Sequence, residues 1–463
     1  MTEQVLNATD PPAESQIREL LELLETKVSL KCPPGIVDPT CADPIVSNDE
    51  LIEPDDPADV ATSVDTTLIA PTHLGYADTA EPLLAVLALW VAYHARNGIV
   101  QHGPGWHEAR KYTIGGSSLS VLMGLNPWGS VDGLISEKIG FSEFKPSTAV
   151  YWGNLFEDIV KQYLEWMYQC VIVGDWLFVI GKRKCTSYSP DGLAVVRMVF
   201  RGKLQWVIVL FEIKTPFGRI PAGKPPKYYV PQVKMGLDLL ELPVVGILAE
   251  AVIRRCEWTD LNHGPAYNPT PSAKKRGTNP LAYGFIGFAL ASGPAVTDPA
   301  YTDWIINRDT FTYAYTNALE AFGDAANDYL CADIGDVDVA VFDLVMLAYS
   351  QKLLVVRPSK MIICARDDQS TATIALDHEL DLFIDECKES AAPIVGMLPW
   401  KLFCVQDHTI DHEAGYVDQW IPKIEEIVGV VRACTESPEK SLQIYQEYLG
   451  GSGGAENDYG DIC

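Results

Sequence analysis

The sequence lacks the features that mark several common protein classes. Its 11 cysteines are an odd number and include no CxxC pair, which argues against a zinc ribbon and against a disulfide scaffold. The most apolar run, Leu83 to Tyr93, is much shorter than the roughly 20 residues of a membrane span. No secretory signal opens the chain and no internal repeat is visible. We therefore expect a soluble intracellular protein with reduced thiols and no membrane partner.

Basic residues are scarce, because 35 Lys and Arg stand against 62 Asp and Glu, for a net charge of -27. Such a balance disfavours nucleic-acid binding, since phosphate contacts need Lys and Arg. The charge is unevenly distributed, however. Residues 101–260 carry a net charge of +3, whereas residues 1–60 and 261–463 carry -11 and -17. Any polyanion site is therefore expected in the middle of the chain.

Apolar periodicity in this middle region predicts helices alternating with strands. The expected helices are 117–124, with Ser117 as its cap, 130–139, 151–169 and 228–240, and the expected strands are 171–180, 193–200, 204–214 and 244–254. Arg201-Gly202-Lys203 is typical of a hairpin turn between two of these strands. The order of the elements indicates an α/β domain with a mixed sheet.

Three side chains of this region are expected to converge. Asp191 lies at the mouth of the predicted hairpin and Glu212 at the far end of its second strand, and an antiparallel hairpin brings those ends together. Glu212 and Lys214 are two residues apart on one strand, so they project from the same face. Carboxylates suit Mg²⁺, and a lysine beside them suits the hydrolysis of a phosphodiester. A lone D…ExK pattern is nevertheless common by chance.

Two further polar residues come from the predicted helices. Glu157, beside the apolar face of helix 151–169, would supply a third carboxylate, and Gln232 of helix 228–240 would hold a water or a backbone amide. Taken alone, Glu157 is more typical of a solvated helix surface than of a site, and Gln232 is uninformative. Their order along the chain gives them weight.

The order of motifs resembles the YqaJ-like viral recombinase group of the PD-(D/E)xK nucleases, which is similar to lambda exonuclease. Six pieces of sequence carry the resemblance: IGGSSLSVLMGLNPW (114–128), EKIG (137–140), WGNLFED (152–158), SPDG (189–192), FEIKTP (211–216) and YYVPQVKMGLDLL (228–240). LPWKLFCV (398–405) and WIPKIEEIV (420–428) resemble a closing strand and helix. The resemblance implies a restriction-endonuclease-like α/β core with a central mixed sheet flanked by helices.

The resemblance also implies roles for individual residues. Asp191, Glu212 and the carbonyl of Ile213 would hold Mg²⁺, for which Mn²⁺ can substitute, and Glu157 would complete this site or a second one. Lys214 would orient and activate the attacking water, with support from Gln232. Arg110 and Ser117, on either side of a Gly-containing loop, would bind a terminal 5′-phosphate.

The function implied is a Mg²⁺-dependent DNA exonuclease of viral recombinase type that digests duplex ends in the 5′-to-3′ direction, in recombination, repair or replication. The alternatives are an endonuclease, a mixed alkaline nuclease, and a nuclease-derived binding or structural protein without catalysis. The expected partners are duplex DNA ends, a single-strand annealing protein and further copies of the chain. A viral protein of this kind would act in the cytoplasm or nucleus of an infected cell.

The predicted organisation has five parts: an acidic, Pro-rich arm (1–74), a nuclease core (75–260), a large insertion (261–394), the closing strand and helix of the core (395–435), and a C-terminal helix and tail (436–463). Other motifs are weaker candidates. His408 and His412 have the spacing of zinc ligands on a helix, but their surroundings favour a structural or solvent-exposed role. The basic clusters 182–184 and 274–276 suit either DNA contact or a solvated loop, and Trp128 and Trp152 favour core positions over stacking.

Overall fold

A computed structural model describes residues 75–101, 103, 105–142, 147–256, 261, 280–322, 339–364 and 369–452. Three predicted features lie outside these residues: the acidic arm, the basic cluster 274–276 and the C-terminal tail. Within the described ranges, no helix is both long and apolar enough to cross a membrane.

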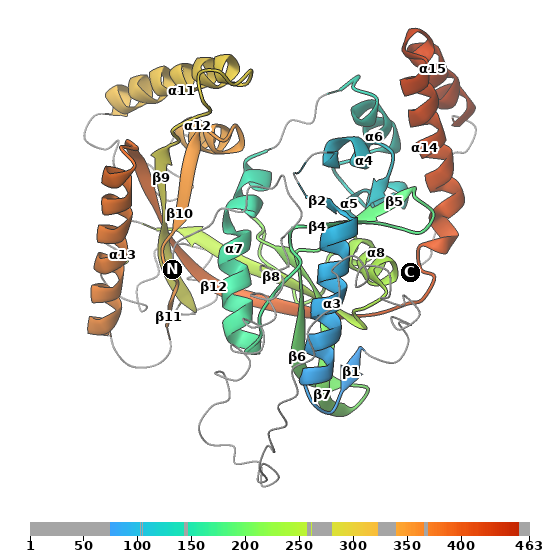
Figure 1. Ribbon diagram of the computed structural model, residues 1–463, viewed down its shortest axis with the longest axis horizontal. Helices are drawn as coiled ribbons and strands as arrows, with labels where there is room; N and C mark the ends of the chain where they lie inside the picture. Colours follow the sequence, from blue (N-terminus) through green and yellow to red (C-terminus); the bar gives the residue numbers. More distant parts are fainter. Residues whose placement is uncertain are drawn as a thin grey trace, which may run out of the picture.

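A large mixed sheet forms the centre of the molecule (Figure 1). Among the described residues it has eight strands, with the order β1-β7-β8-β12-β9-β10, β6 beside β7 and β11 beside β9. β7 and β8 are parallel and the other pairs are antiparallel. The strands are β1 (Tyr76–Ala77), β6 (Gly192–Phe200), β7 (Lys203–Lys214), β8 (Val245–Arg255), β9 (Ala282–Leu290), β10 (Leu354–Pro358), β11 (Ile362–Ile363) and β12 (Ile394–Asp411).

A smaller sheet and the helices surround the large sheet. The small sheet has the order β2-β4-β5-β3 and consists of β2 (Ile99–Val100), β3 (Ile114–Gly115), β4 (Leu177–Ile180) and β5 (Thr186–Tyr188). The described α-helices are α3 (Glu81–Asn97), α4 (Trp106–Lys111), α5 (Gly116–Leu122), α6 (Val131–Lys138), α7 (Thr148–Tyr168), α8 (Val230–Leu240), α11 (Tyr301–Phe322), α12 (Val339–Ser350), α13 (Gln369–Glu389), α14 (Ile421–Glu436) and α15 (Ser441–Ser452). Two 3₁₀ turns, η3 (Asp418–Trp420) and η4 (Pro438–Lys440), precede α14 and α15.

The hairpin of β6 and β7 forms as the sequence predicts. Arg201 and Gly202 both adopt positive φ, at 52° and 78°, which suits a two-residue turn between right-twisted strands. The register runs from Phe200 opposite Lys203 to Gly192 opposite Phe211. The open end of the hairpin therefore lies beside the end of β7.

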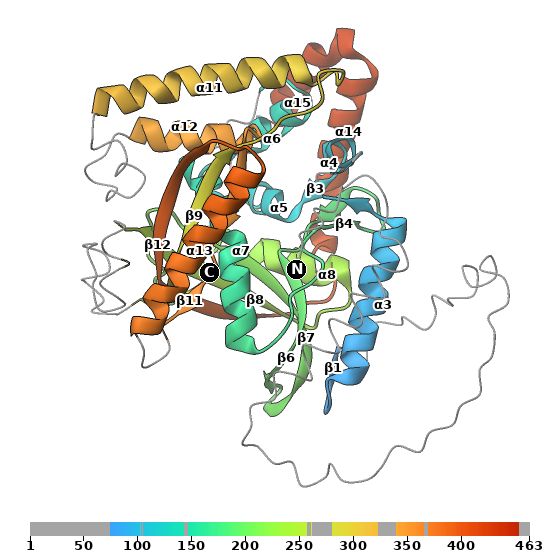
Figure 2. The same cartoon turned by 60° about the vertical axis from the view of Figure 1, so that its left-hand side comes forward.

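Alternation along β6 and β7 separates two apolar cores on opposite faces of the sheet. Val207, Val209 and Phe211 pack with the buried face of α7, whereas Ile208 and Leu210 pack with α3 and α8. Figure 2 shows α7 on one side of β6, β7 and β8, with α8 and α3 on the other. The predicted fold class, an α/β core with a central mixed sheet flanked by helices, is confirmed.

Two smaller apolar clusters complete the packing. One joins α5 and α6 to α14 through residues such as Leu119, Ile135 and Ile424, and includes Met235 of α8. The other packs α13 on β9. β9 pairs with the first half of β12, whose second half pairs with β8, so residues 282–290 share the large sheet with β8. The boundaries of the five predicted parts stay a prediction.

The structure corrects three local predictions. The strand expected over 171–180 is restricted to β4, because Gly174 takes a positive φ of 80° and turns the chain before Leu177. Ser117 is not a cap: the cap residue is Gly115, and Ser117 lies in the first turn of α5. The Gly-containing loop after Arg110 contains β3, which pairs with β5.

Candidate active site

Asp191 is fixed at the open end of the hairpin. Its Oδ2 accepts a hydrogen bond from the backbone N–H of Ile213 at 2.7 Å, which ties the residue before β6 to the end of β7. The same oxygen lies 3.9 Å from the Nζ of Lys214. The structure thus brings Asp191 next to the Glu212–Lys214 pair, although Glu212 stands 21 positions further along the sequence.

Glu212 is completely buried and is held at both carboxylate oxygens. Lys214 donates to Oε1, and the hydroxyl of Tyr188 donates to Oε2 at 2.6 Å. Burial raises the pKa of Glu212 to about 7, and the charge of Asp191 adds to the rise. Lys214 and Tyr188 oppose it by stabilising the charged form. The site therefore concentrates negative charge in a place shielded from water.

Lys214 remains an ammonium in this setting. Burial by itself would lower the pKa of Lys214, but the carboxylates of Glu212 and Asp191 raise it above the usual value. The ammonium also lies over the ring of Tyr229, 5.4 Å from its centroid. A positive charge next to two carboxylates at a strand end is the arrangement that the sequence predicts.

Glu157 approaches from α7 without a hydrogen bond to the other site residues in the described part of the chain. Its surroundings act on its charge instead. Burial raises the pKa of Glu157 to about 8, Asp191 adds to the rise, and Lys161 and Lys214 oppose it. The effect of Asp191 indicates that the two carboxylates are neighbours, so Glu157 is a third carboxylate beside the site.

Tyr188 is a site residue that the sequence analysis misses. It lies on β5, is fully buried, and burial followed by the charge of Glu212 raises its pKa well above the usual value. Its ring lies between two glycines: a Cβ on Gly116 would be 2.8 Å from Tyr188 Cε2, and a Cβ on Gly236 would be 2.4 Å from its Cζ. Both glycines lie inside motifs quoted above. Their lack of a side chain is the sequence feature that indicates a large side chain packed against them.

Gln232 lies in the first turn of α8, beside α5. A Cβ on Gly116 would be 3.1 Å from Gln232 Cγ, so the glutamine packs against the start of α5. Among the described residues its amide makes no hydrogen bond to Lys214 or Asp191. Its support of the lysine or of a water stays a prediction.

Arg110 and Ser117 lie on either side of a tightly held segment. Both are exposed, and the guanidinium of Arg110 stacks 4.5 Å from the ring of Trp106. Between them, Lys138 Nζ donates to the carbonyls of Arg110 and Thr113 at 2.7 and 2.8 Å. Thr113 also contacts the hydroxyl of Ser187, the residue before Tyr188. The predicted phosphate-binding pair is therefore connected to the carboxylate site through β5.

The donor set fits a hard cation with few protein ligands. Within the described residues no group of three or more His, Cys, Asp or Glu side chains is placed to hold a metal ion. The predicted set needs only two carboxylates, Asp191 and Glu212, together with the Ile213 carbonyl. Mg²⁺ is commonly bound by one or two carboxylates and keeps several waters. The raised pKa values of Glu212 and Glu157 also reflect negative charge that a divalent cation would stabilise.

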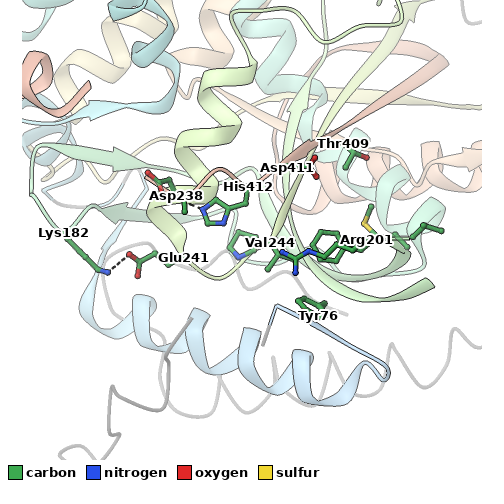
Figure 3. A pocket seen from close by; sticks show the side chains of 14 residues that line it. Tyr76, Lys182, Arg201, Asp238, Glu241, Val244, Thr409, Asp411 and His412 are labelled. Atoms are coloured by element: carbon green, nitrogen blue, oxygen red, sulfur yellow. Dashed lines mark hydrogen bonds and ion pairs between the residues drawn. The ribbon is translucent and has the colours of Figure 1, made fainter. Parts of the chain in front are cut away.

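A cavity of about 760 Å³ lies away from these residues (Figure 3). It is lined at the turn end of the β6–β7 hairpin by Phe200 and Arg201, and just before β8 by Val244. Asp238 and His412 also line it. It contains none of the predicted site residues. The volume of this cavity therefore does not identify the site of chemistry.

The weaker motifs take structural positions. His408 lies 3.4 Å from Glu250 and His412 lies 3.8 Å from Asp238, so the two histidines have different carboxylate neighbours. In the cluster 182–184, Lys182 forms an ion pair with Glu241 and Arg183 lies 3.8 Å from Asp418. Trp152 is buried as expected, but the prediction of a core position for Trp128 is wrong, because that side chain is exposed.

Comparison with known proteins finds a family match in the middle of the chain. Residues 105–239 match the YqaJ-like viral recombinase domain. A curated protein of African swine fever virus, strain Badajoz 1971 Vero-adapted, is 32% identical over 206 residues, which are 40% of this chain and 59% of the relative. Its counterpart in isolate Tick/Malawi/Lil 20-1/1983 is also 32% identical over 206 residues. This chain therefore spans less than two thirds of these curated relatives.

Two solved structures are similar to part of the chain. The crystal structure of LHK-Exo in complex with dAMP is 17% identical, covers 31% of this chain and 72% of that chain, and has a TM-score of 0.26. That of LHK-Exo, an alkaline exonuclease from Laribacter hongkongensis, is 18% identical with the same coverage and a TM-score of 0.25. The region 105–239, which is similar to the YqaJ-like viral recombinase domain, contains all the predicted site residues.

Proposed function

We propose that this protein is a metal-dependent DNA nuclease that degrades duplex DNA from its ends. The observation that carries the proposal is the position of Lys214 at the end of β7, where its ammonium lies next to the carboxylates of both Asp191 and Glu212 in a largely buried place. The match of residues 105–239 to the viral recombinase domain supports the same reaction class.

The site residues have distinct roles in this proposal. Asp191, Glu212 and the Ile213 carbonyl hold Mg²⁺, which when bound supplies a nucleophilic water and neutralises charge on the phosphate. Glu157 completes the carboxylate set. Lys214 keeps its proton at Nζ and stabilises the negative charge that develops at the scissile phosphate, since a preorganised cation in a water-poor site is effective there. Tyr188 fixes the orientation of Glu212.

The direction of digestion is assigned to the Arg110–Ser117 segment. A terminal phosphate carries more charge than an internal diester, and arginine binds phosphate through two parallel hydrogen bonds. Arg110 and Ser117 therefore bind the 5′ end, and digestion proceeds from 5′ to 3′. A single-strand annealing protein would then use the exposed 3′ strand, and the chain would act inside an infected cell.

The test uses linear duplexes labelled at either end, with 5′-phosphate or 5′-hydroxyl termini, and a closed circle of the same sequence. We expect Mg²⁺-dependent release of nucleotides from the linear duplex, starting at the 5′ end, and an intact circle. Arg110→Ala should reduce digestion of the 5′-phosphorylated duplex by one to two powers of ten more than that of the 5′-hydroxyl duplex, because a charge-assisted hydrogen bond contributes about 1.5–3 kcal/mol.

Other outcomes of this test assign other functions. Cutting of the closed circle would make the protein an endonuclease or a mixed alkaline nuclease. Binding of both DNA forms without any release in Mg²⁺ or Mn²⁺ would make it a DNA-binding protein without catalysis. If Arg110→Ala lowers the digestion rate of both linear substrates by the same factor, the role of Arg110 in binding the 5′-phosphate is refuted.

A further inference from the structure

A chain of three aromatic rings leads from Lys214 to the surface. The ring of Tyr229, next to Lys214, lies 4.4 Å from the ring of Tyr228, and Tyr228 lies 4.9 Å from the ring of Trp128 at an angle of 80°. Trp128 stands between α5 and α6 and is 75% exposed. An indole that could bury a large apolar surface is thus presented to solvent close to the candidate active site.

The position of Trp128 is fixed although its side chain is exposed. Its backbone N–H donates to Asn126 Oδ1 at 2.9 Å, a local turn that holds the residue between the two helices. Tyr228 packs edge-on against it. A fixed, exposed aromatic ring is a poor feature for stability but a good one for binding another flat ring.

The segment that carries Tyr228 is the most basic part of this region. Between Glu212 and Asp238 there is no acidic residue, whereas five residues are basic: Lys214, Arg219, Lys224, Lys227 and Lys234. Lys224 and Lys227 are exposed, and neither has a carboxylate partner among the described residues. In a chain of net charge -27, this concentration of positive charge indicates a polyanion.

The same segment is anchored to the sheet. Arg219 forms an ion pair with Glu250, a fully buried residue of β8 opposite Lys214. The N–H of Gly223, at a φ of 87°, donates to Gln406 of β12 at 3.2 Å. Pro225 and Pro226 limit the conformations of the chain between these anchors and Tyr228. Lys224 and Lys227 are therefore presented at defined places.

We propose that Trp128, Tyr228, Lys224 and Lys227 form a strand-binding surface for unpaired DNA, with a base stacked on Trp128 and phosphates on the two lysines. Rings accept any base because every base has a π-face, and lysines follow the backbone, so the surface does not depend on sequence. The inference rests on the proposed function in taking DNA as the polyanion. It adds that the strand at the site is unpaired over the nucleotides next to Lys214.

Binding is measured by fluorescence anisotropy in EDTA, so that no strand is cut. The probes are a labelled oligothymidylate of about 15 nucleotides, the range of such sites, and an abasic phosphodiester strand of the same length and charge. The wild type should bind the oligothymidylate more tightly. Trp128→Ala should weaken that binding by roughly five- to 150-fold, the equivalent of about 1–3 kcal/mol per stacked base, and leave the abasic strand unaffected.

Two sets of variants control this experiment. Tyr313→Ala removes an aromatic ring of α11 that is 73% exposed and should change neither affinity. Lys224→Gln and Lys227→Gln should weaken binding of both strands and each reduce the slope of log affinity against log salt by about 0.7. Equal binding of the two strands by the wild type, or equal affinities of Trp128→Ala and Tyr313→Ala, would overturn the proposal.

The result is separable from that of the nuclease test. If the protein binds oligothymidylate through Trp128 but releases no nucleotides, the proposed nuclease function is contradicted and the proposed strand-binding surface is supported. If the Trp128→Ala variant degrades duplex ends normally and binds the oligothymidylate with unchanged affinity, the proposed nuclease is supported and the proposed strand-binding surface is contradicted.

Discussion

The two ends of the β6–β7 hairpin differ in the charged groups that they bring together. At one end Lys214 lies next to both Asp191 and Glu212, and Glu212 is fully buried. At the other end the hairpin turn borders a cavity of about 760 Å³ whose charged side chains are in part paired with each other, as Lys182 is with Glu241. The cavity therefore has ordinary surface chemistry, while the groups with strongly raised pKa values lie at the other end, outside it. Burial of like charges, and not volume, distinguishes the candidate site.

The largest effect that we expect comes from the two carboxylates. Glu212→Gln or Asp191→Asn should reduce nucleotide release from linear duplex below detection, because each removes a charged ligand of a hard cation while the shape of the side chain is kept. Far-ultraviolet circular dichroism should show an unchanged fold. Asp411→Asn and Glu241→Gln at the cavity end are the matched controls, and retain activity. A reversed result would move the site to the cavity.

Loss of Lys214 should have the next largest effect. Removal of one group that stabilises charge in the transition state typically lowers the rate by about 10²–10³. The rate of nucleotide release by Lys214→Ala should therefore fall by this factor, while calorimetry should still show Mg²⁺ binding. Lys214→Arg should rescue poorly, since the guanidinium differs in shape and hydration. Lys182→Ala, at the cavity end, is the control. Full activity of Lys214→Arg would show that only diffuse positive charge is needed.

Tyr188→Phe should have an intermediate effect of roughly ten- to a hundredfold, because a hydrogen bond to a charged group contributes about 1.5–3 kcal/mol. Loss of the hydroxyl also removes a bond that lowers the pKa of Glu212, so the pH profile of cleavage should move to higher pH. Tyr168→Phe is the control: its hydroxyl likewise donates to a carboxylate, that of Asp407, at 2.7 Å. A fall in rate without movement of the pH profile would indicate a packing role.

The smallest expected effect is the dependence of metal binding on pH. The pKa values of Glu212 and Glu157 are raised to about 7 and about 8, so the metal-free native state binds more protons than the unfolded chain above about pH 4.5. Its stability should therefore fall as pH rises to about 8. Metal binding needs the ionised carboxylates. Mg²⁺ should consequently raise the melting temperature more at pH 9 than at pH 6. Equal shifts at both pH values would contradict the assigned ligands.

The sequence predicts the carboxylate end well because that prediction depends on short-range geometry. A hairpin with a recognisable turn determines which residues lie opposite each other, so Asp191 and Glu212 could be paired from the sequence. The contacts of Tyr188 could not be predicted in this way, because they require β5, α5 and α8 to pack together. In the sequence only the two glycines of α5 and α8 indicate that packing. The pairing of β9 with β12 joins residues about 110 positions apart, and no local pattern specifies it.

Trp128 illustrates a different limit. Sequence reasoning places large aromatic residues in the core because burial of apolar surface is favourable, and for Trp152 this is correct. Trp128 breaks the rule, and such violations are expected where a residue serves binding and not stability. The exposed position of a residue type that usually lies in the core is what indicates a binding role, and this position is known only from the fold.

The central claim is that the divalent ion binds at the carboxylate end of the hairpin. Fe²⁺ in place of Mg²⁺, with ascorbate and peroxide, produces radicals that cut the polypeptide next to the bound ion, and mass spectrometry locates the cuts. The account predicts cuts near residue 191 and residues 212–214 that are lost in Glu212→Gln. Cuts near residues 238–241 and 409–412, or a pattern unchanged by Glu212→Gln, would contradict it.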